Sequence, residues 1–364
     1  MKKLLIGVFV LVVVGFGVWK FQVTKQVETS GKPIVNIGAI LPLTKNNTLS
    51  GNTFKELYQM RLDEVSKDSK YKYELFIEDD QFEITKSMLA AQKLLSVDNV
   101  DILFTSASGA ELGLVDYVSK NKTIMFSQLW DDTAPKKSKY AFMEILLPDH
   151  MSISLLEKLQ AKGVKSISIV AANHRGLLMA VEEVKKRAAD YGVEILDVQL
   201  ANIDTIDWAM TVAKMKQKDP ELYLSMLMPM GTETWGKELK RQGVESNKAT
   251  SINMLDFVAD KELFEGSWYV TDAILNPDFA EKYKTRYGKD LEFTQALWGY
   301  AILDWVIDIY ESYDQKPTTD QVIDRMLSEE RDSIVGRISY DKHGILQGKP
   351  VLKIIRDGKA ELVE

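Results

Sequence analysis

The sequence predicts an α/β protein with two lobes, each a mostly parallel sheet flanked by helices. Short apolar runs, typical of buried strands, alternate with segments whose apolar residues recur at helical spacing. Strands that alternate with helices of this length form parallel sheets with right-handed crossovers. The chain of 364 residues exceeds one typical domain, so we expect two lobes.

Taken in order from residue 34, the expected elements alternate through most of the chain. Strands are expected at 34–41, 73–77, 102–104, 124–126, 166–171, 193–198, 222–228 and 250–254. Helices are expected at 54–65, 84–96, 110–118, 151–161, 177–189, 206–215, 234–241, 279–287, 296–313 and 317–327. Near the C-terminus, the turn residues Asp341 to Gly344 predict a hairpin between 337–340 and 351–355.

The N-terminal segment has the features of a membrane-targeting sequence. Lys2 and Lys3 precede an apolar run at residues 4–19, and a polar linker completes a segment, 1–32, that stands apart from the fold. The two lysines predict that the N-terminus stays inside while the rest is exported. Because no small-residue cleavage site follows, we favour an uncleaved anchor through residues 4–19 over a cleaved signal peptide.

The composition excludes several kinds of site. The chain has no cysteine, which rules out disulfides, a thiolate nucleophile and cysteine-ligated metals. Its histidines (His150, His174 and His343) lack the spacing of a zinc site, so we expect no metal and no cofactor. A net charge of -7 without a basic stripe argues against nucleic acid as a partner. We expect no enzyme, because the chain has neither a P-loop nor a G-x-S-x-G elbow.

The segment from Val100 to Gln128 contains a strand, a polar turn, a helix and a second strand. Small residues such as Ser106 and Ser108 precede the helix. The unpaired N–H groups and the dipole at a helix N-terminus bind anions such as a carboxylate. Ligands of open α/β sheets also sit outside the carboxyl ends of the strands. Two interpretations stay open: the serines only cap the helix, or the turn binds a ligand.

Seven motifs, in their order along the chain, resemble the type I periplasmic binding proteins of the leucine/isoleucine/valine-binding branch, which serves ABC importers. They are IGAILPLT followed by Ser50-Gly51, LFIEDDQF, FTSASG, FEGSWYVTD, FAEKYKTRYGKD, ALWGYAILDWVID and VGRISYDKHGILQGKPVLKIIRDGK. The resemblance covers about residues 34 to 360. It implies three crossovers between the lobes, near Pro148, Ala273 and Gly336. Lobe 1 is then 33–147 plus 274–335, and lobe 2 is 148–273 plus 336–364.

The resemblance implies that the ligand lies between the lobes, which close on it. Ser106, Ala107, Ser108 and Gly109 stand where such proteins hold an amino-acid carboxylate through a serine hydroxyl and backbone N–H groups. These four residues are therefore expected to bind the carboxylate of the ligand.

Five other residues are also expected to bind the ligand. Four of them stand where the chain departs from the family pattern, and the fifth, Asp256, matches it. Ser127, Gln128 and Trp130 stand where the family has residues that bind the same end of the ligand. Trp130 either lines the pocket or packs in the core. Arg175 replaces an aromatic residue; its cation suits an additional acidic group, or it is simply exposed. Asp256 stands where branched-chain binders pair the ligand ammonium, or it caps the following loop.

The function expected from this resemblance is that of an extracytoplasmic solute-binding protein. It captures a small ligand, an amino acid or a related compound, and delivers it to an ABC permease. The alternative is a membrane-anchored ligand-sensing receptor domain of the same fold, coupled to a signalling partner.

Overall fold

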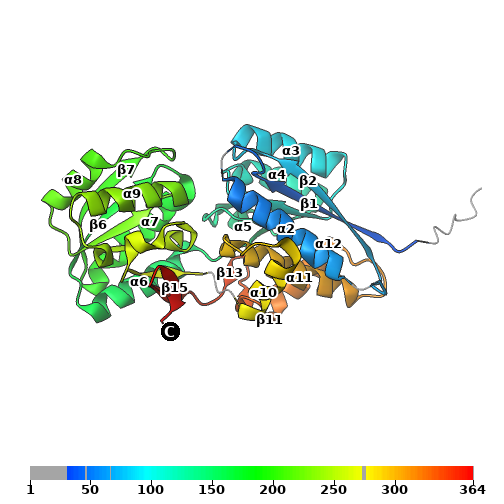
Figure 1. Cartoon of the computed structure of the whole chain (residues 1–364). Helices are drawn as coiled ribbons and strands as arrows, with labels where there is room; N and C mark the ends of the chain where they lie inside the picture. Colours follow the sequence, from blue (N-terminus) through cyan, green and yellow to red (C-terminus); the bar gives the residue numbers. More distant parts are fainter. Residues whose placement is uncertain (1–30, 46, 66, 273–275, 364) are drawn as a thin grey trace, which may run out of the picture. The chain divides into compact units, whose positions relative to one another are not determined.

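Two parallel sheets form the centres of the two lobes in the computed structural model, which describes residues 31–45, 47–65, 67–272 and 276–363 (Figure 1). The first sheet has the order β2-β1-β3-β4-β5, with β1 (Ile34–Leu41), β2 (Lys72–Asp79), β3 (Ile102–Thr105), β4 (Ile124–Ser127) and β5 (Ala141–Met143). The second has the order β7-β6-β8-β9, with β6 (Ser166–Ala172), β7 (Glu194–Ala201), β8 (Leu222–Met226) and β9 (Ala249–Ser251). All of these strands pair in parallel, so the predicted two-lobed α/β fold is confirmed.

Helices cover both faces of each sheet (Figure 1). The helices of the first lobe are α2 (Thr48–Glu64), α3 (Ile84–Ser96), α4 (Glu111–Asn121), α5 (Thr133–Lys137), α10 (Pro277–Tyr287), α11 (Leu297–Glu311) and α12 (Thr319–Ser328). Those of the second are α6 (Pro148–Lys162), α7 (Arg175–Arg187), α8 (Ala209–Gln217) and α9 (Pro229–Arg241). Short 3-10 turns are η1 (Ala188–Tyr191), η2 (Ser246–Lys248), η3 (Met254–Phe257), η4 (Lys261–Phe264) and η5 (Thr294–Ala296).

The C-terminal strands pair differently from the predicted hairpin. β12 (Gly336–Tyr340) pairs with β11 (Glu330–Ser333) and β13 (Leu346–Gln347). β14 (Val351–Arg356) pairs instead with β10 (Trp268–Thr271) and β15 (Lys359–Leu362). The turn itself forms, because Asp341 accepts hydrogen bonds from the N–H groups of His343 and Ile345. It leads into the short β13, which ends before Gly348 and Pro350, so the prediction of a 337–340/351–355 hairpin was wrong.

These pairings also locate the last passage between the lobes. The Met143 N–H donates to the Gly344 carbonyl at 2.9 Å, and the Tyr340 hydroxyl donates to the Met143 carbonyl at 2.9 Å, so β12 and β13 stay with the first lobe. β14 joins β10 in the second lobe. We therefore propose that the chain crosses at 348–350, whereas the resemblance implies a crossing near Gly336. On this basis we propose lobe 1 as 34–147 plus 276–347 and lobe 2 as 148–272 plus 351–363.

The predicted membrane anchor at residues 4–19 lies outside the described residues. In the part of the chain that the structure describes, no helix is long and apolar enough to cross a bilayer.

A glycine allows the buried helix α11 to approach α2 closely. The sequence predicts α11 to be apolar on nearly every side, and most of its side chains are buried. A Cβ added at Gly299 would lie 2.5 Å from Glu144 Oε1 and 2.8 Å from ring atoms of Phe54 and Tyr58. Those atoms belong to packed rings and a buried carboxyl group, so they have little room to move.

We therefore expect Gly299→Ala to lower the free energy of unfolding by about 1–3 kcal/mol, the usual cost of overpacking a core. Gly113→Ala is the matched control, because its Cβ would meet only the flexible Met88 side chain, with the sulfur at 3.1 Å. That change should leave stability unchanged or raise it by up to about 1 kcal/mol through helix propensity. Urea unfolding of both variants tests this. Equal effects would show that Gly299 is not a close-contact position.

Candidate functional site

A cavity with a volume of about 80 Å³, measured to the centres of water-sized spheres, lies between the lobes. A cavity of this volume suits a small organic molecule. The first lobe contributes Asn47, Ser50, Phe82, Ala107, Gln128, Leu129, Trp130, Ile145, Phe293 and Gln295. The second contributes His174, Gly176, Leu177, Met228, Pro229, Met254 and Phe257.

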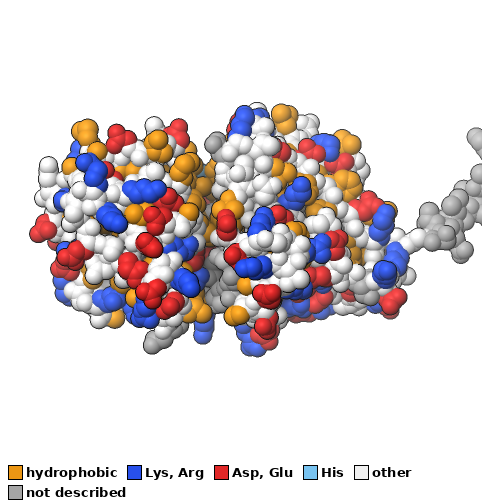
Figure 2. Space-filling model, viewed as in Figure 1, with side chains coloured by type: hydrophobic (Ala, Val, Ile, Leu, Met, Phe, Trp, Pro, Cys, Tyr) orange, Lys and Arg blue, Asp and Glu red, His pale blue; other side chains and the backbone are white. Residues whose placement is uncertain are grey.

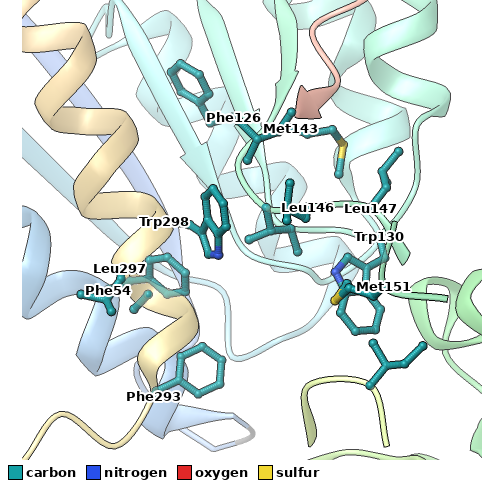
Figure 3. Close-up of a cluster of buried hydrophobic side chains, with 14 of the residues drawn as sticks. Phe54, Phe126, Trp130, Met143, Leu146, Leu147, Met151, Phe293, Leu297 and Trp298 are labelled. Carbon is teal, nitrogen blue, oxygen red and sulfur yellow. The ribbon is translucent and has the colours of Figure 1, made fainter. Parts of the chain in front are cut away.

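The parallel sheet explains why distant segments meet here. Four neighbouring strands, β1 to β4, end at one edge, and the segments that follow them carry Ser50, in the first turn of α2, and the loop residues Phe82, Ala107 and Gln128 to the cavity. This edge is where ligands of open α/β sheets bind. Figure 3 shows that Trp130 and Phe293 continue into a hydrophobic cluster with Trp298, so the wall they form is firmly packed.

Two pairs of rings join the lobes at the cavity. Phe257 and Phe293 stack with centroids 4.5 Å apart, and Phe82 stacks on His174 at 5.8 Å. Each pair takes one ring from each lobe. The walls are therefore largely apolar and partly aromatic, and they favour a ligand with a planar or branched apolar body.

One residue that lines the cavity carries a buried hydrogen-bond donor without a partner. Trp130 Nε1 has no hydrogen-bond partner among the described residues, and the Trp130 side chain is only 5% exposed. An N–H group buried without a partner costs free energy, so this position favours a bound molecule that accepts a hydrogen bond.

His174 adds no positive charge at neutral pH. Burial lowers its pKa below the usual 6.5, and the hydrogen bond to the Ala107 carbonyl only partly offsets this. His174 Nε2 lies 3.1 Å from that carbonyl oxygen, which can only accept. Nε2 therefore carries the proton of a neutral ring, and the contact ties the second lobe to the turn after β3.

A buried acid lies behind Gln128. Glu144 is fully buried and accepts a hydrogen bond from the Tyr58 hydroxyl at 2.7 Å, while its Oε2 has no partner among the described residues. Burial raises the pKa of Glu144 to about 8, although Tyr58 and the Gln128 amide lower it in part. The Glu144 carboxyl is therefore protonated at pH 7 and places no negative charge behind the cavity.

Three of the nine predicted ligand-binding residues line the cavity: Ala107, Gln128 and Trp130. Trp130 lines the cavity and also packs in the hydrophobic core, so its contact with a ligand stays a prediction. In the described part of the chain, no group of three or more acidic or histidine side chains could hold a metal ion.

The predicted serines and glycine shape the turns next to the cavity. The Ser106 hydroxyl donates to the buried carboxylate of Asp80, and Ser108 Oγ lies 2.8 Å from Ser87 Oγ. Gly109 has a φ of +94°, which a residue with a Cβ rarely adopts. Ser127 Oγ accepts a hydrogen bond from the Leu129 N–H at 3.2 Å. None of these four described residues lines the cavity, and their ligand contacts stay a prediction.

The two predicted charged residues are paired within the protein. Arg175 donates to the carboxylate of Asp131, and burial of Asp131 is outweighed by hydrogen bonds from Arg175 and Thr133, which hold its pKa below the usual range. Asp256 Oδ1 accepts from Lys353 Nζ and from the Tyr269 hydroxyl, each at 2.8 Å. Neither Arg175 nor Asp256 lines the cavity, and their ligand roles stay predictions.

Several lining residues were not predicted, among them Phe82, His174, Met228, Phe257 and Phe293. Phe82 could have been found, because it follows the carboxylates that end a strand at the ligand edge of the sheet. His174 stands beside Arg175 in the segment already singled out. Phe293 precedes a long helix, and no local signal in the sequence marks it.

A sequence-family model described as periplasmic binding protein matches residues 34–349. The chain belongs to the periplasmic binding protein family. The resemblance inferred from the motifs is thereby confirmed, and with it a solute-binding fold of the kind that serves ABC transporters.

Solved structures of similar fold agree with this family. A solute-binding protein of an ABC transporter from Rhodopseudomonas palustris BisB5, in complex with 3,4-dihydroxybenzoic acid, is 17% identical, with a TM-score of 0.79 over 90% of this chain and 95% of that one. A second, from R. palustris with benzoate, is 12% identical, with a TM-score of 0.80 over 91% and 95%. The branched-chain amino acid binding protein LivJ from Streptococcus pneumoniae, with isoleucine, is 14% identical, with a TM-score of 0.79 over 91% and 99%.

The family fixes the general role of the site. Its members and these structures are binding proteins rather than enzymes, and the family implies an extracytoplasmic location. The cavity between the lobes is therefore the candidate ligand site.

Because of three buried acidic side chains, the free energy of unfolding is expected to fall as the pH rises. Burial raises the pKa values of Glu111 and Glu144 to about 8 and that of Asp272 to about 7. In the unfolded chain the pKa is ~4.3 for glutamate and ~3.9 for aspartate. Between about pH 5 and pH 8 the folded chain therefore binds more protons than the unfolded chain, and these groups lower stability as the pH rises.

We expect Glu144→Gln to flatten this dependence, because a neutral amide can still accept from Tyr58 but cannot ionise. The free energy of unfolding of the wild type should fall faster than that of the variant between pH 5 and pH 8, by up to about 1.4 kcal/mol per pH unit. Urea unfolding across this range measures both slopes. Glu157→Gln, at an exposed position on α6, is the control. Parallel slopes for wild type and Glu144→Gln would contradict the raised pKa.

Proposed function

We propose that this chain is an extracytoplasmic solute-binding protein that captures a small, mostly apolar organic acid between its lobes for delivery to an ABC importer. The observation that carries the ligand class is a cavity walled by aromatic rings, one of which, Trp130, has a buried Nε1 without a partner among the described residues. A carboxylate satisfies such a donor, and the rings contact an apolar body.

The charges around the cavity support an acid without an ammonium group. No aspartate or glutamate occurs among the described residues that line it. An ammonium buried there needs an anionic partner. Asp256, the predicted partner, already accepts from Lys353, and both side chains are at least nine-tenths buried. Moving Asp256 toward a ligand would leave the Lys353 charge buried and alone.

Structural neighbours support the same class. Proteins of this fold have been solved with benzoate, 4-hydroxybenzoate and 3,4-dihydroxybenzoic acid, each of which combines a flat apolar ring with a carboxyl group. These neighbours are less than 20% identical to this chain, so they support the ligand class through the shared fold only.

An α-amino acid is the second candidate. Asp256 Oδ2 is buried without a partner among the described residues, which leaves one oxygen for an ammonium group. LivJ, a structure of similar fold, was solved with isoleucine. This candidate requires η3, which carries Asp256, to shift toward the cavity.

The proposal includes an N-terminal segment that stays attached to the protein as a membrane anchor. The charged and apolar pattern of residues 1–32, with no small-residue cleavage site, supports a tether that keeps the receptor beside its permease. Sequencing the N-terminus of native material tests this, and a mature N-terminus after residue 19 would contradict an uncleaved anchor.

We expect benzoate or 4-hydroxybenzoate to raise the melting temperature of the protein, and isoleucine to leave it unchanged. A ligand at 100 times its dissociation constant stabilises the fold by ~2.7 kcal/mol. Trp130→Phe keeps the ring but removes the donor, so it should weaken binding roughly tenfold or more, the usual worth of a hydrogen bond to a charged group.

Trp235→Phe is the matched control for this change. Trp235 is also buried with an unpartnered Nε1 but does not line the cavity, so its loss should not alter affinity. Calorimetric titration of the three proteins gives the affinities. If isoleucine stabilises the protein and the aromatic acids do not, the amino-acid candidate replaces the aromatic acid.

A further inference from the structure

The segment His174–Gly176 at the start of α7 holds the second lobe against the first without any ligand. All three residues contact the first lobe: the His174 ring binds the Ala107 carbonyl, Arg175 binds Asp131, and Gly176 packs on Trp130. These contacts are made by the protein alone.

The ion pair is the strongest of these contacts. Arg175 Nε donates to Asp131 Oδ2, and its Nη2 lies 3.5 Å from Thr133 Oγ1. The Asp131 side chain is only 1% exposed, whereas that of Arg175 is 50% exposed. Opening the lobes would remove the cation from a buried carboxylate, and a hydrogen-bonded charge pair of this kind is stronger than an exposed one.

The pair also lies immediately outside the ligand cavity. Trp130 and Gly176, the chain neighbours of Asp131 and Arg175, both line that cavity. A Cβ added at Gly176 would lie 3.3 Å from the Trp130 backbone nitrogen, so the two backbones touch where the lobes meet. The half-exposed Arg175 side chain thus follows directly in sequence and space on residues that line the cavity.

We propose that Arg175 is a positioning residue rather than a ligand-binding residue: with Asp131 it forms an interlobe latch that favours the closed cleft before a ligand binds. We define the latch as Arg175, Asp131 and the neighbouring His174–Ala107 contact. It rests on the two-lobed solute-binding fold of the proposed function but not on the class of ligand.

The latch lowers the free energy that contacts with a ligand must supply to close the cleft. Closure that depends on ligand contacts alone leaves the free protein open, whereas a latch populates the closed form in advance. The latch also fixes the position of Trp130 in the cavity wall. Asp131 follows Trp130 in the sequence, and Gly176 of the second lobe packs on Trp130 from across the cleft. Loss of the latch should therefore increase the open population and leave the fold of each lobe intact.

The absence of cysteine allows two spin labels to be placed cleanly. Leu89→Cys on α3 and Met210→Cys on α8 put one label on each lobe, at side chains that are 62% and 75% exposed. Double electron–electron resonance then reports the distance between the lobes. The full-length protein is unfolded and refolded before measurement to remove any carried-over ligand.

We expect Arg175→Gln to broaden the distance distribution of the ligand-free protein and to raise the ratio of open to closed forms about three- to thirtyfold. Asp131→Asn should act in the same direction. The double variant should add little to the stronger single change, because both remove one contact. Arg187→Gln, at the other end of α7, removes an ion pair with Glu183 inside the second lobe and should leave the distribution unchanged.

Distributions of Arg175→Gln and Asp131→Asn that superimpose on the wild type would overturn the latch, as would fully additive effects of the two changes. Because no ligand is present, this result is independent of the ligand class. If benzoate, 4-hydroxybenzoate and isoleucine all fail to raise the melting temperature, the proposed ligand classes fall, while the label distances still decide the latch.

Discussion

The hydrogen bond between Tyr58 and Glu144 lies at the point where the parts of the first lobe meet. Tyr58 belongs to α2, and Glu144 follows β5 and binds the Ser127 carbonyl at the end of β4 through its own N–H. The backbone of Gly299 on α11 packs directly over both side chains. One buried acid thus joins the sheet edge, two helices and the strand end that presents Gln128 to the cavity. A charged carboxylate would be costly there, so the acid stays protonated at neutral pH.

The cost of an unpaired buried charge also determines which groups surround the ligand cavity. Two charged pairs beside residues that line it, Arg175 with Asp131 and Asp256 with Lys353, are made within the protein. The His174 ring is neutral. What remains at the cavity are uncharged polar groups, among them the Trp130 indole N–H, against apolar walls. Such a site recognises an acceptor by hydrogen bonding rather than by a full opposite charge. It therefore discriminates strongly against analogues that leave a buried donor unpartnered.

The sequence predicted those features that depend on local pattern. The alternation of apolar runs and helical spacing located the strands of both parallel sheets, and the position of the turn after β3 pointed to the sheet edge at which the cavity lies. The site was predicted less well, because its residues are fixed by partners far away in the chain. Asp256 meets Lys353, 97 residues later, and Arg175 meets Asp131 across the lobes. Periodicity carries no information on such pairs, nor on the pairing of β12 with β13 instead of β14.

The latch and the apolar cavity together suggest how affinity and access are balanced. If the free protein already populates the closed form, a ligand supplies less free energy for closure, and weak contacts to a small acid are sufficient for useful affinity. Ligand entry and release are slower as a result, because the ion pair and the His174–Ala107 contact must break before a ligand can enter or leave. A half-exposed arginine suits this role, since water can solvate its guanidinium as it leaves Asp131. A fully buried pair would stabilise closure more, but it would also slow release of the ligand, which is unfavourable for the proposed delivery to a permease.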